Sequence, residues 1–252
     1  MTGLPQKNKN AHFHCLICKK DSAPVQLAVY EHVAFTACGH CGSVTTLPLP
    51  EKNEIKESLK LSGHAKEETF PTGREKKQYL KHLKALAQIK PSGRFLDAQC
   101  RTGQRVEMAR MNGFSDVMGI DINHYCIELA EKRYPKSKYQ TTALKDLDKN
   151  GFDIIYSAHA LENTPDPDTY IEILLNHLAP DGRVFLTLCD GNHFMIPQSF
   201  LNWRQLRYPE RAHYISRRGL ETLLKRHNLI IEKRFLRFLP YQHVIVKRRN
   251  KQ

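Results

Sequence analysis

Four of the seven cysteines fall into two C-x2-C pairs, and this spacing constrains the fold of the N-terminal segment more than any other feature. The pairs are Cys15 with Cys18 and Cys38 with Cys41, and nineteen residues separate them. Two residues between cysteines let both thiolates of a turn bind one ion, and two such turns complete a tetrahedral zinc site. Because four thiolates leave no coordination position open, the sequence predicts a structural Zn²⁺ in a small ribbon over residues 1–50.

Two disulfides or a redox dithiol are the competing interpretations of the cysteine pairs. Structural disulfides require export, and the start MTGLPQKNKNAHF lacks the apolar middle of a signal peptide. A redox dithiol needs only one pair. Histidines near the cysteines are weaker candidates for a fourth ligand: His12, His14, His32 and His40. Between the pairs, VQLAVYEHVAFTAC alternates enough to predict a hairpin.

From Arg94 onward, short apolar runs alternate with helical patterns. The expected strands are RFLDA, VMGID, YQTTA, FDIIYSA and RVFLTL, and helical patterns such as NHYCIELAEKRY and SRRGLETLLKRH separate or follow them. This order predicts an α/β domain, a Rossmann-like sheet that is mostly parallel and has helices on both faces. Two final runs in LIIEKRFLRFLPYQHVIVKR leave no room for a helix, which predicts a terminal antiparallel hairpin. Residues 51–90 are expected to form a linker and a helix.

Acidic residues end the first two expected strands of this sheet. Asp97 closes RFLD and Asp121 closes VMGID. Ligands of open parallel sheets bind at the carboxyl ends of the strands, and a carboxylate can accept hydrogen bonds from both hydroxyls of a ribose. Capping of the following helix is the alternative role for Asp121. The pattern favours a nucleoside-binding edge.

The motifs LDAQCRTG, VMGIDIN, FDIIYSAHALENTPDP and LAPDGRVFLTL, in this order, resemble class I S-adenosylmethionine-dependent methyltransferases. With the cysteine ribbon in front, the chain is similar to a branch whose members act on sugars, polysaccharides and other small molecules. The resemblance implies a seven-stranded domain over residues 91–252, with a substrate-side insertion around 192–215, and S-adenosylmethionine as cofactor. It further implies His213 as the catalytic base and the cofactor contacts Asp97, Gln99, Arg101, Gly103, Asp121, Ile122 and Ser157.

The loop after the first strand departs from the family pattern D-x-G-x-G-x-G. Gln99 and Arg101 replace two glycines, and only Gly103 remains. Glycine lets the backbone approach the cofactor closely, so Gln99 is expected to crowd its methionine part, whereas Arg101 is suited to pair with its carboxylate. These changes leave open a catalytically degenerate binding or regulatory protein. His159 and His193, each expected just after a strand, are further candidates for the base.

The positive charge gathers at the two ends of the chain. Residues 1–90 carry a net charge of +6, residues 91–200 of −4, and residues 201–252 of +11, the last from 14 basic and 3 acidic side chains. This asymmetry favours an anionic partner, either a small-molecule or glycan-type acceptor or, as the alternative, ribosomal or transfer RNA. No run of about 18 apolar residues is present, so we expect a cytoplasmic protein without a membrane span.

Overall fold

The computed structural model describes residues 6–7, 13–64, 73–235 and 239–249. The chain forms two compact units. The first comprises Met1–Lys56, His159–Ile171 and Leu186–Gln252, and the second comprises Glu57–Ala158 and Glu172–Phe185. The ribbon thus shares a unit with the C-terminal segment, which a division by sequence position does not reveal. No helix within the described ranges combines the length and apolar character that a membrane crossing requires.

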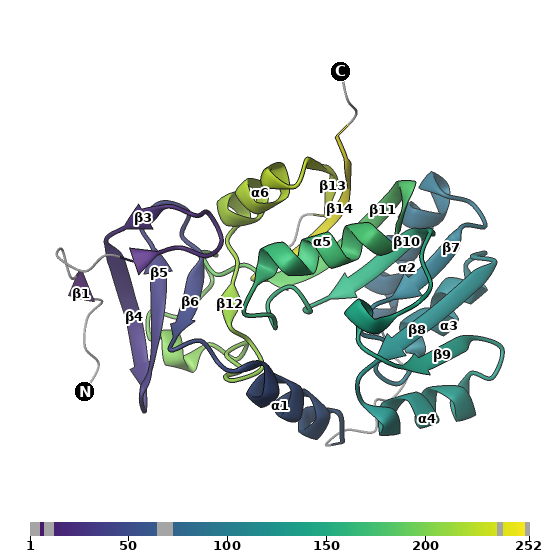
Figure 1. Ribbon diagram of the computed structural model, residues 1–252, viewed down its shortest axis with the longest axis horizontal. Coiled ribbons are helices and arrows are strands. Elements are labelled where there is room, and N and C mark those ends of the chain that lie inside the picture. The colour runs from purple at the N-terminus through teal and green to yellow at the C-terminus, as the bar shows by residue number, and fades with distance from the viewer. Residues whose placement is uncertain (1–5, 8–12, 65–72, 236–238, 250–252) are drawn as a thin grey trace. The chain divides into compact units, whose positions relative to one another are not determined.

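The first unit contains the ribbon, a five-stranded antiparallel sheet (Figure 1). Its strand order is β1 (Gln6–Lys7), β4 (Pro24–Tyr30), β5 (Val33–Cys38), β6 (Val44–Leu47) and β12 (His213–Tyr214). The predicted hairpin is confirmed, because β4 and β5 pair from Pro24 opposite Cys38 to Tyr30 opposite Val33. A separate pair, β2 (Phe13–His14) and β3 (Asp21–Ser22), carries the first cysteine turn between its strands.

Strand β12 comes from the C-terminal part of the chain and completes the ribbon sheet. It pairs antiparallel with β6, with His213 opposite Thr45 and Tyr214 opposite Val44. Aromatic packing supports this junction: the ring of Tyr214 lies 5.1 Å from that of Trp203, and the rings of Phe35 and Phe200 are 5.5 Å apart. All four rings are buried, so the ribbon shares one core with the segment that carries Phe200, Trp203 and Tyr214.

The main sheet has seven strands in the order β13-β14-β11-β10-β7-β8-β9. Their bounds are β7 (Arg94–Asp97), β8 (Asp116–Asp121), β9 (Lys138–Thr141), β10 (Phe152–Ala158), β11 (Leu178–Cys189), β13 (Leu229–Phe235) and β14 (Tyr241–Arg248). Strands β10, β7, β8 and β9 pair in parallel, and β13 and β14 form an antiparallel hairpin. Both the parallel sheet and the terminal hairpin are therefore confirmed.

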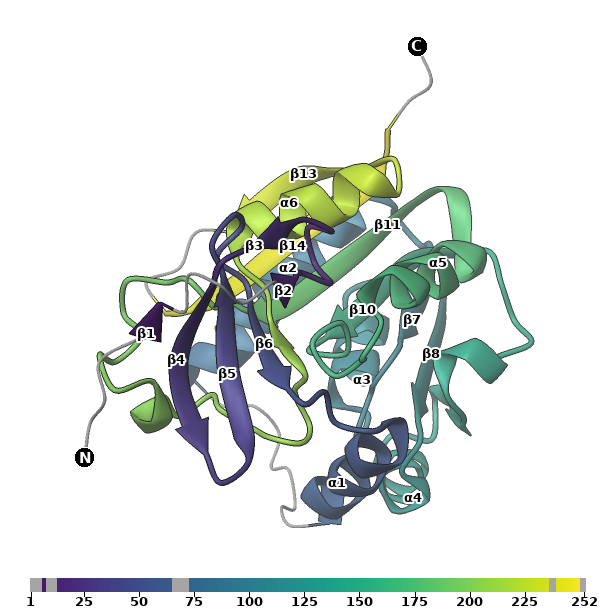
Figure 2. The same ribbon diagram turned by 60° about the vertical axis from the view of Figure 1, so that its left-hand side comes forward.

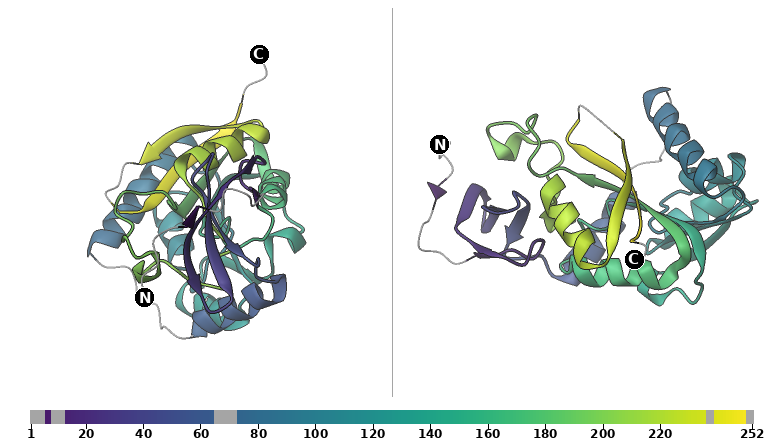
Figure 3. Two further views of the ribbon diagram at one scale, coloured as in Figure 1. Left: turned by 90° about the vertical axis from the view of Figure 1, so that its left-hand side faces the viewer. Right: turned by 90° about the horizontal axis from the view of Figure 1, so that it is seen from above.

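Six α-helices lie within the described residues. They are α1 (Lys52–His64), α2 (Gly73–Ile89), α3 (Gln104–Met111), α4 (His124–Arg133), α5 (Pro167–His177) and α6 (Arg217–Arg226), with 3₁₀ turns at Leu144–Asp146 and Phe200–Asn202. Side chains cap the N-termini of α4 and α6. Ser216 caps the N-terminus of helix α6, and its hydroxyl accepts from the Gly219 amide at 2.9 Å. The helix lies against β13, as Figures 2 and 3 show.

Candidate functional site

The carboxyl ends of β7, β8 and β10 meet at one edge of the parallel sheet and bring the predicted cofactor residues together. Asp97 ends β7, and its register partners are Gly119 on β8 and Tyr156 on β10. Asp121 ends β8 two residues after Gly119, and Ser157 follows Tyr156. Strands pair side by side at this edge, so acids that lie 24 positions apart in the sequence belong to one local surface.

The Asp97 carboxylate is fully buried and pairs with Arg105 on α3. Arg105 Nε lies 2.8 Å from Asp97 Oδ2, and its Nη2 donates to the Gln99 carbonyl at 2.7 Å. The guanidinium also lies over the Tyr156 ring, 5.5 Å from the centroid. A buried charge needs such a partner, and here the chain itself supplies it. An amino group of a ligand would therefore meet an Asp97 that is already neutralised.

The loop between β7 and α3 closes on Asp121 through its backbone. Arg101 has a left-handed backbone with φ of 50°, and its amide donates to Asp121 Oδ2 at 3.0 Å. The Gln99 amide lies 3.3 Å from Asp97 Oδ1. Gly103 also has a positive φ, 81°, where an added Cβ would lie 2.7 Å from Tyr139 Oη, so glycine is required there.

Asp121 is 6% exposed and retains acceptor capacity. Its Oδ2 accepts from the Arg101 amide and its Oδ1 from the Asn123 amide at 2.9 Å, which leaves each oxygen a further lone pair. Burial raises the pKa of Asp121, although these two amides oppose the shift. Ile122 is half-buried and Ser157 is buried. The helix after Asp121 is capped by the Asn123 side chain, so Asp121 is not needed as the cap.

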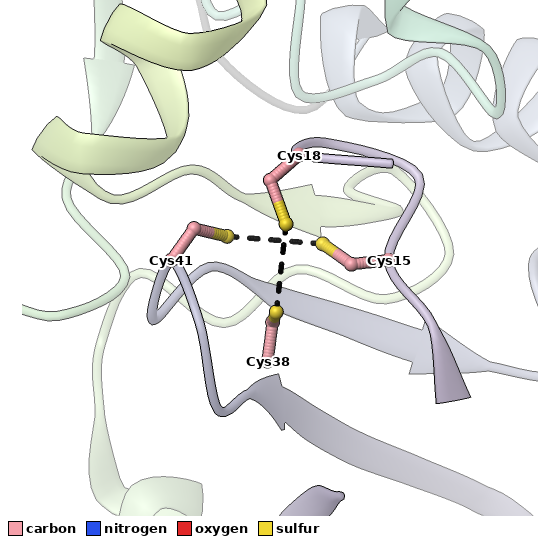
Figure 4. Close-up of side chains that lie close together, drawn as sticks. All are labelled: Cys15, Cys18, Cys38 and Cys41. Atoms are coloured by element: carbon pink, nitrogen blue, oxygen red, sulfur yellow. Dashed lines mark hydrogen bonds between the residues drawn. The ribbon is translucent and has the colours of Figure 1, made fainter. Parts of the chain in front are cut away.

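The four cysteines of the C-x2-C pairs converge in the ribbon, and all are buried (Figure 4). The Sγ atoms of Cys15 and Cys41 are 3.7 Å apart, as are those of Cys18 and Cys38. An ion bound tetrahedrally with Zn–S distances of about 2.3 Å separates any two sulfurs by about 3.8 Å, so the cluster has the size of a zinc site. A hydrogen bond from Cys15 lowers the pKa of Cys41 to about 5, and the same contact raises that of Cys15.

The ribbon histidines lie outside this cluster or outside the described residues. His14 Nδ1 contacts the Asp21 carboxylate at 2.9 Å, and His40 Nε2 contacts the Asp21 carbonyl at 3.1 Å. His32 is exposed in the turn between β4 and β5, and His12 is not among the described residues. The candidate metal set therefore consists of the four thiolates, a donor set suited to Zn²⁺.

His213, the predicted base, lies in β12 and is completely buried. Its Nδ1 is 3.1 Å from the Thr45 hydroxyl of β6, and its Nε2 is 3.4 Å from the Pro165 carbonyl. Burial lowers the pKa of His213 to about 4. Both ring nitrogens therefore have protein partners, one on β6 and one between β10 and α5, and the role of His213 as a base stays a prediction.

A second histidine, His159, follows directly after β10 and forms part of a polar cluster. Its Nδ1 lies 2.7 Å from Glu162 Oε2, while Glu162 Oε1 accepts from the Cys189 amide at 2.6 Å. The Arg211 guanidinium is 3.9 Å from the same carboxylate and donates to the Gln205 carbonyl at 2.7 Å. Glu162 and Arg211 are buried, whereas the His159 side chain is 30% exposed.

Sequence reasoning missed the two buried partners Arg105 and Arg211. Arg105 stands eight residues after Asp97 on the first turn of α3, a separation at which no local rule predicts an ion pair. Glu162 stands in the HALEN motif, and its i,i−3 relation to His159 was available as a signal. Its pairing with Arg211 depends on the tertiary fold alone.

Comparison with known proteins places these features in a family. The model of a family described as "Methyltransferase domain" matches residues 73–233, well over half of the chain. A ubiquinone biosynthesis O-methyltransferase of Neisseria meningitidis is 27% identical over an alignment of 117 positions, and the match covers 43% of this chain and 48% of that protein. The chain thus spans about half the length of this curated relative.

Solved structures share the fold at low sequence identity. The 1,6-didemethyltoxoflavin-N1-methyltransferase of Burkholderia thailandensis has a TM-score of 0.58 at 17% identity, covering 91% of this chain and all of that one. The magnesium protoporphyrin IX methyltransferase of Synechocystis, solved with S-adenosylhomocysteine, has a TM-score of 0.61 at 15% identity, covering 79% of this chain and all of that one.

Proposed function

Because the chain belongs to the methyltransferase-domain family, we propose that it transfers a methyl group from S-adenosylmethionine to a small anionic acceptor. When bound, this cofactor supplies an electrophilic methyl group on a sulfonium. The observation that carries the proposal is the Asp121 carboxylate at the carboxyl end of β8. Each of its oxygens accepts one backbone amide and has a lone pair left for a ribose hydroxyl.

We propose that the other cofactor contacts come from the same carboxyl edge of the parallel sheet. Ile122 follows the last residue of β8, Ser157 is the penultimate residue of β10, and the Arg101 guanidinium would pair with the cofactor carboxylate. Asp97 is not available to the cofactor in the same way, because Arg105 already neutralises it. We therefore assign Asp97 the role of holding α3 and the loop in place.

The anionic nature of the acceptor is supported by basic side chains that acids do not balance. Several arginines of residues 201–252 pair within the described residues, among them Arg217 with Asp190 and Arg226 with Asp168. Arg204 and Arg218 are exposed, and neither forms an ion pair within the part of the chain that is described. The known relatives named above act on small molecules by their names, which favours a small acceptor over RNA.

We further propose that the four-cysteine cluster holds one structural Zn²⁺. The four thiolates would complete a tetrahedral shell, so the ion would stabilise the ribbon and take no part in methyl transfer.

Calorimetry with S-adenosylmethionine and S-adenosylhomocysteine on zinc-loaded protein tests the cofactor assignment. Asp121→Ala should weaken both ligands at least tenfold, since hydrogen bonds to a charged acceptor contribute about 1.5–3 kcal/mol each. Asp146→Ala, which removes an exposed aspartate paired with Lys145, is the matched control and should leave the affinity unchanged. Absence of binding by the wild-type chain would rule out the cofactor.

Tritiated methyl transfer to a panel of acceptors tests the substrate class. The panel contains hydroxylated aromatic carboxylates, sugar phosphates and bulk transfer RNA. Labelling of a small acceptor supports the proposal, whereas labelling of RNA alone, with binding that falls steeply as salt rises, would replace it.

A further inference from the structure

His159 has an unusual backbone conformation at the carboxyl edge of the parallel sheet. It is the residue after Ala158, which ends β10, and its φ is 62°, a left-handed value that is rare for a residue with a Cβ. Its amide donates to the Thr187 carbonyl of β11 at 2.7 Å, which holds the residue in this conformation. Such outliers are retained where the surrounding structure fixes them, and they concentrate at functional sites.

The Glu162 carboxylate fixes the protonation of one ring nitrogen of His159. Burial alone would raise the pKa of Glu162, but Arg211 and His159 beside it hold that pKa below its usual value, so the group is ionised. An ionised carboxylate can only accept hydrogen bonds. At 2.7 Å from Glu162 Oε2, Nδ1 must therefore carry a proton, which in the neutral ring leaves Nε2 as a bare acceptor.

The Arg211 guanidinium beside the pair disfavours a metal ion at this position. Arg211 balances the charge of Glu162, and its Nη1 lies 3.2 Å from Cys189 Sγ. The His159, Glu162 and Cys189 ligand atoms lie within 4.8 Å of one another, but a cation among them would face this guanidinium. The Tyr241 ring lies edge-on to the His159 ring, with the centroids 5.9 Å apart. Within the described ranges, Nε2 of His159 has no hydrogen-bond partner, and the side chain is partly exposed.

We propose that His159 is the general base of the methyl transfer, that Glu162 is its positioning residue, and that the acceptor atom is a hydroxyl oxygen. This inference rests on the proposed function. The oxygen forms a bond to the methyl carbon as the carbon–sulfur bond breaks, and the electron pair of that bond returns to sulfur. The hydroxyl proton passes to Nε2 and then to solvent. A carboxylate or thiolate acceptor would need no such base.

The geometry favours His159 as the general base over His213, the residue that the sequence motifs favoured for this role. Both nitrogens of His213 have protein partners and the ring is completely buried, whereas His159 keeps one nitrogen and part of its surface open. The pair also has the arrangement of an activated general base: the Glu162 carboxylate orients one ring nitrogen of His159, and the other ring nitrogen can accept a proton.

Nitrogen-15 NMR of histidine-labelled protein at pH 8 tests the tautomer without any acceptor. His159→Gln identifies the signal by its loss. The expected signal is a neutral ring with a proton on Nδ1 and none on Nε2, and Glu162→Gln should mix the two tautomers. A proton on Nε2 in the wild-type protein would overturn the proposal, even if no acceptor had been found.

Kinetics with the hydroxyl acceptor identified by the labelling panel test the chemical role. His159→Gln should lower kcat by about 100-fold or more with little change in the Kd of S-adenosylmethionine, and added imidazole should restore part of the rate. His227→Gln is the matched control, because His227 also lies 2.7 Å from a carboxylate, that of Asp168, and the rate should be unchanged.

The outcomes of these experiments separate the two proposals. Loss of cofactor binding in the wild-type protein defeats the proposed function, whatever the tautomer of His159. Normal cofactor binding with methylation of a thiol or carboxylate only, or full activity of His159→Gln, defeats the base assignment and leaves the proposed function in place.

Discussion

Replacing Cys38 by serine tests how far the proposed metal site stabilises the first unit. The change removes one of four thiolates, and it disturbs a turn that is bonded to the C-terminal segment. Within the turn, the Gly42 amide donates to the Cys38 carbonyl and the Cys38 amide to the Ser43 carbonyl, each at 2.9 Å. Ser216, which caps α6, donates to the Cys41 carbonyl, and its amide donates to Ser43 Oγ at 3.1 Å.

These four hydrogen bonds set the expected size of the effect. None of them uses the Cys38 side chain, so they break only where the turn opens after the metal is lost; at about 1 kcal/mol each, they oppose that opening by about 4 kcal/mol. Domains are stable by only about 5–15 kcal/mol, so the ribbon and strand β12 should open in a measurable fraction of molecules. The disturbance should reach β12 because the Thr46 amide of β6 donates to the Ala212 carbonyl at 3.0 Å.

Elemental analysis measures the zinc content of the variant, and hydrogen exchange measures the opening of its strands. Zinc should fall from one ion per chain to none, and amides of β6 and β12 should lose protection while β7 and β8 keep theirs. Cys126→Ser is the matched control, since Cys126 is an equally buried cysteine on α4 outside the cluster, and it should retain the zinc. Unchanged protection of β12 in zinc-free protein would refute the reasoning.

Three further predictions concern buried groups of both units. Arg105→Gln should lower the free energy of unfolding, measured by urea denaturation, by about 3–5 kcal/mol, because it leaves the buried Asp97 carboxylate without a partner. Adding Asp97→Asn should restore most of this stability, whereas additive losses in the double variant would contradict the ion pair. Because the folded pKa of His213 is about 4 against 6.5 unfolded, stability is complete above pH 6.5 and should fall by up to about 3 kcal/mol towards pH 4, a slope that His213→Gln should remove. Gly103→Ala should lower the Tm more than Gly113→Ala, because both have positive φ but only Gly103 has neighbours within 3 Å of an added Cβ; equal shifts would contradict this.

Features that depend on local pattern were predictable from the sequence. The β4–β5 hairpin follows from alternation in residues 25–38, and the parallel order of β7, β8 and β10 follows from apolar runs separated by helices. The cysteine cluster follows from spacing, because a C-x2-C turn carries its own geometry. The positions of Asp97 and Asp121 at one edge follow from strand ends.

Features that depend on distant partners were not predictable. Strand β12 has two residues and no alternation of its own, and it exists because β6 offers it an edge. The Asp97 carboxylate was expected near the cofactor, but the helix that follows places Arg105 on it. The family motif predicted His213 as a catalytic base, but the burial of its ring against Thr45 and Pro165 depends on the assembled fold.

The pairing of β6 with β12 has a consequence for the order in which this chain can fold during synthesis. Thr45 leaves the ribosome 168 residues before its neighbour His213. Until then β6 is an edge strand with open amides and carbonyls, and such edges template association with other chains. The nascent ribbon therefore needs either its metal or a chaperone to protect the β6 edge until residue 213 has been synthesised. A chain stalled before residue 213 would be prone to aggregate.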